Sequence, residues 1–409
     1  MSEWIKYKLS EVADIIGGGT PSTTIDEYWN GNIPWLTPRD LTNYSFKYIS
    51  KGERSITESG LRNSSARLLP KGSVLLTSRA PIGYLVIAES EVCTNQGFKS
   101  FVINESRVDS EFLFYLLKNN VDNIKSVGTG TTFAEVSGTT LKNLEFLFPE
   151  DVIVQKEIAS ILSSLDDKIE LNLQMNQTLE AMAQAIFKEW FVNFNFPGFD
   201  GELVDGLPKG WKNSSIGELV SVQNGFAFKS GDFLDVGNNG VIKIKNISNN
   251  VVDIVNMQFV SDEVVASVDN RFKVKSGDLL IAMTGAEVGK VGFVPNNEKN
   301  LWLNQRVGSF KEKVKFAKWF AYLILSTKEY QNVLLSSASG SAQPNISASQ
   351  IERVETIIPI HNLVESFGEI VNPLFEKMLE NFKQNQNLTE IRDSLLPKLM
   401  TGKIRLNHD

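Results

Sequence analysis

Hydrophobic positions along the chain follow two spacings, and the change from one to the other occurs twice. Residues 1–150 consist mainly of short runs rich in Val, Ile and Phe that are separated by Gly, Pro, Asn and Ser, and this pattern predicts strands joined by turns. Residues 211–360 show the same pattern. Each region also contains one helical segment, at residues 110–124 and 317–334. We therefore expect a mixed α/β domain in each region.

A comparison of the chain with itself shows that the two regions are related. Gly72 in "PKGSVLLTSRAPIG" (70–83) corresponds to Gly277 in "VKSGDLLIAMTGAEVG" (274–289), and an apolar strand follows both. The other matches are "WIKYKLSEV" (4–12) with "WKNSSIGEL" (211–219), "TNQGF" (94–98) with "LNQRV" (303–307), and "GTTFAEVSGTTLKNLEFLFP" (130–149) with "GSAQPNISASQIERVETIIP" (340–359). Because their order is the same in both halves, one structural unit is expected to occur twice.

A long helix is predicted to close each half, at residues 155–191 and 364–399. In the first helix, steps of four and three connect Leu165, Ile169, Asn172, Asn176, Leu179, Ala183, Ile186 and Trp190. This is the heptad spacing of a coiled coil. The second helix has a less regular seam through Leu374, Met378, Asn385, Leu388 and Leu395. A repeat related by a two-fold axis would place the two helices antiparallel.

Both helix centres are rich in amides, in "LNLQMNQTLEAM" (171–182) and "NFKQNQNLTEI" (381–391). Buried amides on a coiled-coil seam fix the register of the pair at some cost in stability. In an antiparallel pair the two amide-rich centres would lie level and could hydrogen-bond to each other. The alternative is that these side chains face solvent. Asn172 and Asn176 favour the first interpretation because they lie on the seam.

The composition indicates a cytoplasmic protein of several domains. The 409 residues suit two to four domains. No apolar run approaches the roughly 20 residues that a membrane span needs, and the N-terminus lacks the apolar stretch of a signal peptide. The single cysteine, Cys93, excludes an internal disulfide framework.

Few residues are available for catalysis. His361 and His408 are the only histidines, so a Cys–His nucleophile pair is formally possible but a Cys/His metal cluster is not. "GAEVGKV" (285–291) is one residue shorter than a phosphate-binding loop and has Val291 where Ser or Thr would reach the metal. Pro21 follows the glycines at 17–19, which favours a turn there over a cofactor loop. We expect no bond-making chemistry in this chain.

Basic residues are unevenly distributed although the net charge is −7. Eight basic and three acidic residues lie between Arg39 and Arg79, a local charge of +5. Smaller clusters are Lys243/Lys245, Arg271/Lys273/Lys275 and Lys311/Lys313/Lys315/Lys318. Two related domains held by paired helices suit a DNA target that is read in two parts. The alternative for each cluster is a solvated basic face.

Four segments of the first half resemble one family: "IIGGGTPST" (15–23), "IPWLTPRDL" (33–41), "LPKGSVLLTSRAPIG" (69–83) and "TNQGF" (94–98). They are similar to the first target-recognition domain of type I restriction–modification specificity subunits. "GLPKGW" (206–211) and the two long helices resemble the same family's layout. The resemblance implies a non-catalytic subunit that reads a bipartite DNA site, one half-site per domain, with paired helices that set the distance between the domains.

The resemblance also implies partners. These are double-stranded DNA, two methyltransferase subunits and motor-nuclease subunits. S-adenosylmethionine is expected on the methyltransferase, and no cofactor is expected on this chain. The resemblance does not supply the bases of each half-site or the spacer length. A stand-alone coiled-coil scaffold and a self-sufficient enzyme are the competing hypotheses.

The fold expected is α+β, with two repeated target-recognition domains joined by two long antiparallel coiled-coil helices. The boundaries are 1–152 and 211–360 for the domains, 153–195 and 361–405 for the helices, and 196–210 for a linker. Arg can read guanine or hold a phosphate, and amides can read adenine, although "TNQGF" could merely stabilise a turn. Candidate DNA contacts are Arg39, Lys47, Arg54, Arg62, Arg67, Ser78, Arg79, Asn95, Gln96, Lys243, Lys245, Asn246, Arg271, Lys273, Thr284, Gln305, Arg306 and Asn345.

Overall fold

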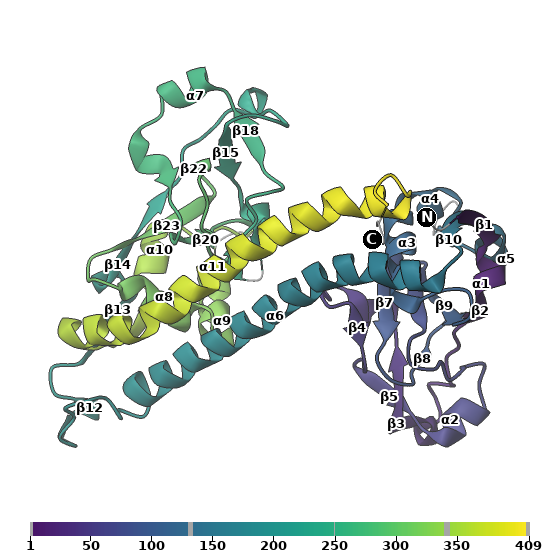
Figure 1. The fold of residues 1–409 in the computed structure, drawn as a ribbon. Helices are drawn as coiled ribbons and strands as arrows, with labels where there is room; N and C mark the ends of the chain where they lie inside the picture. The colour runs from purple at the N-terminus through teal and green to yellow at the C-terminus, as the bar shows by residue number, and fades with distance from the viewer. Residues whose placement is uncertain (1–2, 130–133, 249, 339–343, 406–409) are drawn as a thin grey trace. The chain divides into compact units, whose positions relative to one another are not determined.

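The computed structural model describes residues 3–129, 134–248, 250–338 and 344–405 (Figure 1). The chain divides into two compact units. Unit 1 comprises Met1–Leu171 and Asn387–Asp409, and unit 2 comprises Asn172–Gln386. The two long helices, α6 (Val152–Phe191) and α11 (His361–Met400), each contribute one half to each unit. The remainder of each unit is here called its head.

The head of unit 1 contains two sheets and a separate strand pair. The five-stranded sheet has the order β2 (Ala13–Gly17), β9 (Phe98–Ile103), β6 (Val74–Ser78), β7 (Ile82–Ala88) and β4 (Tyr48–Ile49). The three-stranded sheet is β5 (Arg54–Ile56), β3 (Trp29–Leu36) and β8 (Cys93–Thr94), and β1 (Trp4–Lys8) pairs with β10 (Glu145–Pro149). The helices are α1 (Leu9–Val12), η1 (Asp26–Tyr28), η2 (Pro38–Leu41), α2 (Glu58–Arg62), α3 (Ser110–Asn119), α4 (Val121–Ser126) and α5 (Gly138–Asn143).

The head of unit 2 repeats this plan with extra strands. Its larger sheet has the order β14 (Val220–Asn224), β23 (Val307–Glu312), β20 (Leu279–Ala282), β21 (Val291–Phe293), β17 (Asn250–Val252) and β16 (Ile247–Ser248). The smaller sheet is β18 (Gln258–Val260), β15 (Asn239–Ile242), β22 (Asn300–Leu303) and β19 (Lys273–Val274). The strand pairs are β13 (Lys212–Ser215) with β24 (Glu355–Ile358), and β11 (Leu203–Val204) with β12 (Leu207–Pro208). The helices are η3 (Ile216–Glu218), η4 (Ser230–Asp232), η5 (Ile244–Asn246), α7 (Asp262–Ala266), η6 (Asn270–Phe272), η7 (Gly285–Glu287), α8 (Ala317–Leu325), α9 (Lys328–Ser337) and α10 (Ala348–Glu352).

The two sheet orders correspond strand by strand. The run β2–β9–β6–β7 in unit 1 matches β14–β23–β20–β21 in unit 2, and β5–β3–β8 matches β18–β15–β22. In the smaller sheet of unit 1, β3 pairs antiparallel with β5 and parallel with β8. In that of unit 2, β15 likewise pairs antiparallel with β18 and parallel with β22. The predicted repeat of a mixed α/β domain is therefore confirmed, although the first residues of the matched segments 130–149 and 340–359 lie outside the described residues.

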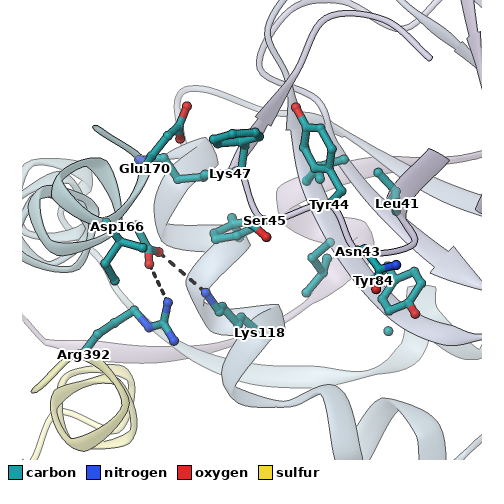
Figure 2. A pocket seen from close by; sticks show the side chains of 16 residues that line it. Leu41, Asn43, Tyr44, Ser45, Lys47, Tyr84, Lys118, Asp166, Glu170 and Arg392 are labelled. Atoms are coloured by element: carbon teal, nitrogen blue, oxygen red, sulfur yellow. Dashed lines mark hydrogen bonds and ion pairs between the residues drawn. The ribbon is translucent and has the colours of Figure 1, made fainter. Parts of the chain in front are cut away.

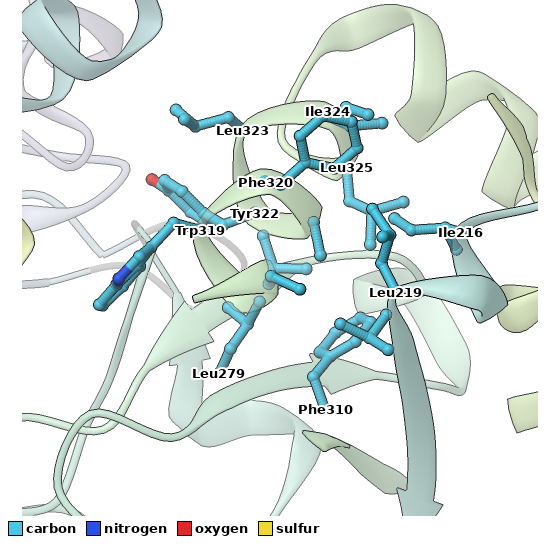
Figure 3. Packing of buried hydrophobic residues seen from close by; sticks show 14 of the residues in the cluster. Ile216, Leu219, Leu279, Phe310, Trp319, Phe320, Tyr322, Leu323, Ile324 and Leu325 are labelled. Carbon is cyan, nitrogen blue, oxygen red and sulfur yellow. The ribbon is translucent and has the colours of Figure 1, made fainter. Parts of the chain in front are cut away.

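The apolar central strands explain how each head packs. Successive side chains of a strand point to opposite faces, so Val74 and Leu76 of β6 join the cluster around α3 while Leu75 joins a second cluster on the other face. Leu279 and Leu280 of β20 divide in the same way in unit 2. Figure 3 shows Leu279 below α8, whose Trp319, Phe320 and Tyr322 fill the same cluster. A strand that is covered on both faces needs the continuous apolar run seen in the sequence.

The halves of the long helices run antiparallel within each unit. In unit 2, Asn172 Nδ2 donates to Gln384 Oε1 and Asn385 Oδ1, both at 2.8 Å, while Asn381 Nδ2 donates to Asn176 Oδ1 at 2.8 Å. In unit 1, Ile158, Ala159 and Leu162 of α6 share a cluster with Leu396, Leu399 and Met400 of α11. Residue numbers fall along α11 as they rise along α6, as antiparallel pairing requires.

The seam amides of the two centres lie in the interface, whereas Gln174, Gln177, Gln384 and Asn387 are exposed. Asn172, Asn176 and Asn381 are 0%, 5% and 1% exposed. Asn381 and Phe375 were not among the expected seam residues, yet both are buried, whereas Leu374 beside Phe375 is only partly buried. Among the other seam residues expected from the sequence, Met378 is buried. The partly buried ones are Leu165, Ile169, Leu179, Asn385 and Leu388. The seam of α11 is more regular than its sequence indicated because Asn381 continues it.

Candidate nucleic-acid interface

Five short segments of unit 1 meet at one end of its sheets, and together they are called loop cluster 1: residues 18–20, 37–41, 78–81, 95–97 and 134–136. Backbone hydrogen bonds connect them to one another and to the ends of β3 and β8. Gly19 N donates to Thr94 O at 2.9 Å and Asn95 N donates to Leu36 O at 2.8 Å. Ser78 N donates to Gly97 O at 2.8 Å, and Val136 N donates to Ser78 O at 3.0 Å. The strands therefore hold these loops together.

Unit 2 has the same arrangement, called loop cluster 2: residues 225–227, 243–247, 283–286, 304–306 and 344–346. Phe226 N donates to Leu303 O at 2.8 Å and Asn304 N donates to Ile242 O at 3.1 Å. Met283 N donates to Arg306 O at 3.0 Å, and Ile346 N donates to Met283 O at 2.9 Å. These four bonds correspond one by one to those of loop cluster 1, so the repeat extends to the loop backbones.

Asn95 shapes a turn in loop cluster 1. Its Oδ1 accepts a hydrogen bond from Gly97 N at 2.9 Å, and Asn304 Oδ1 in unit 2 accepts from Arg306 N at 3.4 Å. Such side-chain-to-backbone bonds mimic a backbone turn. Asn95 therefore stabilises a turn, which is the alternative considered for "TNQGF" in the sequence. The neighbouring Gln96 and Gln305 are exposed at matched positions.

Gly18 permits a close approach of two loop backbones. A Cβ added at Gly18 would lie 2.0 Å from the carbonyl oxygen of Asn95, and one added at Gly225 would lie 2.3 Å from that of Asn304. Any side chain would separate the loops at this point. Gly18 thus serves a packing function. Gly17 is the last residue of β2 and residues 18–20 form an irregular loop, so the turn expected from the sequence is not found there.

A side-chain cap fixes the segment that contains Arg39. Asp40 Oδ2 accepts from Thr37 N at 2.7 Å, and in unit 2 Asn246 Oδ1 accepts from Lys243 N at 3.0 Å. Arg39 and Lys245 occupy the matched, exposed positions beside these caps. The structure thus gives both loop clusters an exposed cation at this matched position on a fixed backbone.

Several other candidates are also accessible. In unit 1, Arg54, Arg62 and Arg67 are exposed, and Arg79 is half-buried. The Arg54 guanidinium lies 3.6 Å from the ring centroid of Trp29, so the ring restricts its position. In unit 2 the exposed candidates are Arg271, Lys273, Arg306 and Asn345, whereas Lys243 is half-buried. Burial and the neighbouring Lys245 lower the pKa of Lys243.

Four candidates have structural roles instead. Lys47 is 5% exposed, and its Nζ lies 2.9 Å from Glu111 and 3.0 Å from Asp167. Ser78 is fully buried and donates to Gly97 O, and Asn246 is 1% exposed and caps its own turn. Thr284 is 3% exposed. The sequence placed these residues near the loops, but their side chains point into the protein and bond there, so they do not present a surface to DNA.

Unit 1 has a cavity of about 440 Å³ beside the start of the basic stretch between Arg39 and Arg79. Residues of the head and of both long helices line it (Figure 2). Asp166 Oδ1 lies 2.6 Å from Arg392 Nη1, and Lys118 Nζ is 3.6 Å from Asp166 Oδ2. Burial by itself would raise the pKa of Asp166, but Lys118 and Arg392 hold it below its ordinary value. These charges satisfy one another and attach the head to the helices.

The described part of the chain contains no group of three or more His, Cys, Asp and Glu residues that could hold a metal ion. Cys93 is buried, which raises its pKa to about 11. His361 begins α11, and His408 lies outside the described residues. Within the described ranges, no helix is long and apolar enough to cross a membrane.

The fold and the loop clusters define a class of protein: a duplicated recognition module in which two α+β heads present the same loops with different side chains. Residues 1–181 and 208–390 match the family model described as the type I restriction modification DNA specificity domain, and the chain belongs to this family.

Relatives support this assignment over the whole chain. The type I restriction enzyme MjaIX specificity subunit of Methanocaldococcus jannaschii is 36% identical over 99% of this chain and 94% of its own length. The HindI specificity subunit of Haemophilus influenzae is 26% identical over 99% of this chain and all of its own. A crystal structure of a type I S subunit from M. genitalium has the same fold, with a TM-score of 0.61 at 17% identity over 100% of this chain and 97% of that one.

Proposed function

We propose that this chain is the DNA-reading subunit of a type I restriction–modification complex and that each unit reads one half of a bipartite target. The observation that carries this proposal is the duplicated loop cluster. Four corresponding backbone hydrogen bonds hold the loops in both units, while several accessible side chains on them differ, such as Glu135 in unit 1 and Asn345 in unit 2. An unchanged frame with different side chains suits two half-sites of different sequence.

Two kinds of contact follow from the matched positions. Arg39 and Lys245 are exposed cations on capped turns, and we assign them to phosphates, which both half-sites offer whatever their sequence. Gln96 and Gln305 are exposed amides at the matched turn, and a Gln side chain can bond adenine at N6 and N7. Arg306 beside Gln305 offers the donors that guanine accepts.

The partners belong to the same proposal. Methylation requires a donor and a catalytic centre, and we assign both to methyltransferase subunits, two per specificity subunit, that bind S-adenosylmethionine. We assign cleavage to separate motor-nuclease subunits. The specificity subunit then selects the DNA site, and the other subunits methylate or cleave the DNA.

The test is equilibrium binding of the full-length chain, with its methyltransferase partner, to duplexes selected from a random library. Arg39→Ala and Lys245→Ala should weaken binding to selected and scrambled duplexes alike, and each should reduce the slope of log K against log salt by about 1. Gln96→Ala and Gln305→Ala should weaken only the selected duplex. Lys6→Ala, an exposed position on β1, is the control. A wild-type complex that prefers no duplex over scrambled DNA would support the scaffold alternative.

A further inference from the structure

A carboxylate lies among the cations of loop cluster 1. Glu135 Oε2 is 3.7 Å from Arg79 Nη1, and Glu135 Oε1 is 3.3 Å from Lys99 Nζ. The side chains of Arg79 and Glu135 are 37% and 39% exposed, whereas that of Lys99 is 15% exposed. Arg79 and Glu135 are thus both accessible, and the more deeply buried Lys99 forms an ion pair with the Glu135 carboxylate.

The backbone fixes this pair. Arg79 and Glu135 form an antiparallel bridge, so their side chains are cross-strand neighbours. Glu135 is held from its other side as well, because its N donates to Thr129 O at 2.9 Å and its O accepts from Thr129 N at 3.0 Å. A position that is bridged on both sides presents its side chain in a defined direction.

The pair is poorly suited to a phosphate but complementary to a base pair. A carboxylate repels phosphate and weakens the attraction of the neighbouring cations. In the major groove, guanine offers two acceptors, N7 and O6, and the paired cytosine offers a donor at N4. Arg79 has paired donors and Glu135 has acceptors, side by side, as the edge of a G·C pair requires.

The matched position in unit 2 has different chemistry on the same backbone. Thr284 and Asn345 form the corresponding antiparallel bridge, and Thr284 Oγ1 is 3.3 Å from Asn345 Oδ1. Asn345 is exposed, and an Asn side chain, like Gln, can bond adenine at N6 and N7. The cross-strand pair therefore changes from Arg and Glu to Thr and Asn between the two loop clusters.

We propose that Arg79 and Glu135 together read one G·C base pair of the first half-site, and that Asn345 at the matched position reads an adenine of the second. Arg79 donates to guanine N7 and O6, and Glu135 accepts from the cytosine amino group. Lys99 is a positioning residue that holds the Glu135 carboxylate. The inference rests on the proposed function, and it names the base pair that these residues select.

The experiment is selection of bound duplexes from a random library by the full-length chain with its methyltransferase partner. The double variant Arg79→Thr/Glu135→Asn transfers the unit 2 pair into unit 1. It should replace one G·C pair by A·T in the first half-site and leave every other position unchanged. Glu135→Gln, which nearly conserves volume, should reduce the preference for G·C at that position by about tenfold, the size of one good base contact.

A matched control separates specificity from general charge loss. Lys6→Thr/Glu145→Asn makes the same polar changes in an exposed ion pair between β1 and β10, with Nζ and Oε2 at 2.7 Å, and should leave the selected motif unchanged. If Glu135→Gln weakens all duplexes equally, or if no base preference in the first half-site changes in either loop variant, the assignment is overturned. If the wild type selects no motif at all, the proposed function itself has failed.

Discussion

Matched tyrosines attach the two heads to the long helices, but the contacts around these tyrosines differ in chemistry. Tyr115 of α3 donates to Asp166 of α6 at 2.8 Å, and Tyr322 of α8 donates to Glu180 of α6. Around Tyr115 the contacts are ionic, since Asp166 also binds Arg392 and Lys118. Around Tyr322 they are aromatic, because Trp319 stacks on Phe375 with ring centroids 4.2 Å apart and planes at 2°.

The difference shows that the geometry of the junction can be kept while its energetics change. The aromatic junction is stabilised by apolar burial. Each aromatic pair adds about 0.5–1.5 kcal/mol to the stabilisation that comes from the buried area alone. The ionic junction must first desolvate its charges, and it remains stable only while each charge keeps its partner. The junction in unit 1 should therefore be more sensitive to pH and to single charge deletions than the junction in unit 2.

The largest effect is expected from Asp166→Ala in unit 1. The substitution leaves Arg392 and Lys118 without their common counter-charge, and breaking a buried pair in this way costs about 3–5 kcal/mol. Denaturant unfolding measures the change in the free energy of unfolding. Asp393→Ala is the matched control, because Asp393 binds the same guanidinium at 2.7 Å but its side chain is 56% exposed. Equal losses in both variants would show that burial does not govern this junction.

A smaller effect is expected from Phe375→Leu in unit 2. Leucine keeps most of the apolar contact but loses the stack on Trp319, so the expected loss is about 1–1.5 kcal/mol. Ile370→Ala on the exposed face of α11 should change stability by less than about 0.5 kcal/mol. A Phe375→Leu loss no greater than that of Ile370→Ala would mean that the stacked rings contribute nothing.

The smallest effect expected is a change in pH dependence. Burial would raise the pKa values of Asp166 and Glu111, but their hydrogen-bond and charge partners hold both below the ordinary values of 3.8 and 4.5. The stability that these carboxylates add is present above their unfolded pKa values, and it is lost as pH falls through the lower folded values. Asp166→Asn should therefore flatten the fall of unfolding free energy below about pH 5.

The same titration distinguishes the two units. Phe375→Leu should keep the wild-type slope in acid, because its junction gains from apolar contact rather than from a titrating pair. If Asp166→Asn and the wild type lose stability in parallel between about pH 5 and pH 2, the ionic junction is not the source of the acid sensitivity.

Local pattern alone determined much of this protein. The strand-rich heads and the long helices follow from spacings that recur within one turn of helix or two residues of strand. The repeat follows from motifs that return in the same order, and the antiparallel pairing was expected from that repeat. Asn172 and Asn176 were placed on the seam by the heptad period, which does not depend on what the helix packs against.

Only the tertiary structure decided which polar side chains remain available for binding. Lys47 belongs to the basic stretch in sequence, but it is bound to Ser163, which is 116 residues away. Asn246 caps its own turn, and Asn381 lies on the helix seam. Glu135 was not among the candidates because an acidic residue is not expected in a DNA-binding surface. Each of these outcomes depends on partners that are brought near by folding over long sequence separations. Burial and charge pairing are properties of that assembled environment, so the order of residues along the chain does not reveal them.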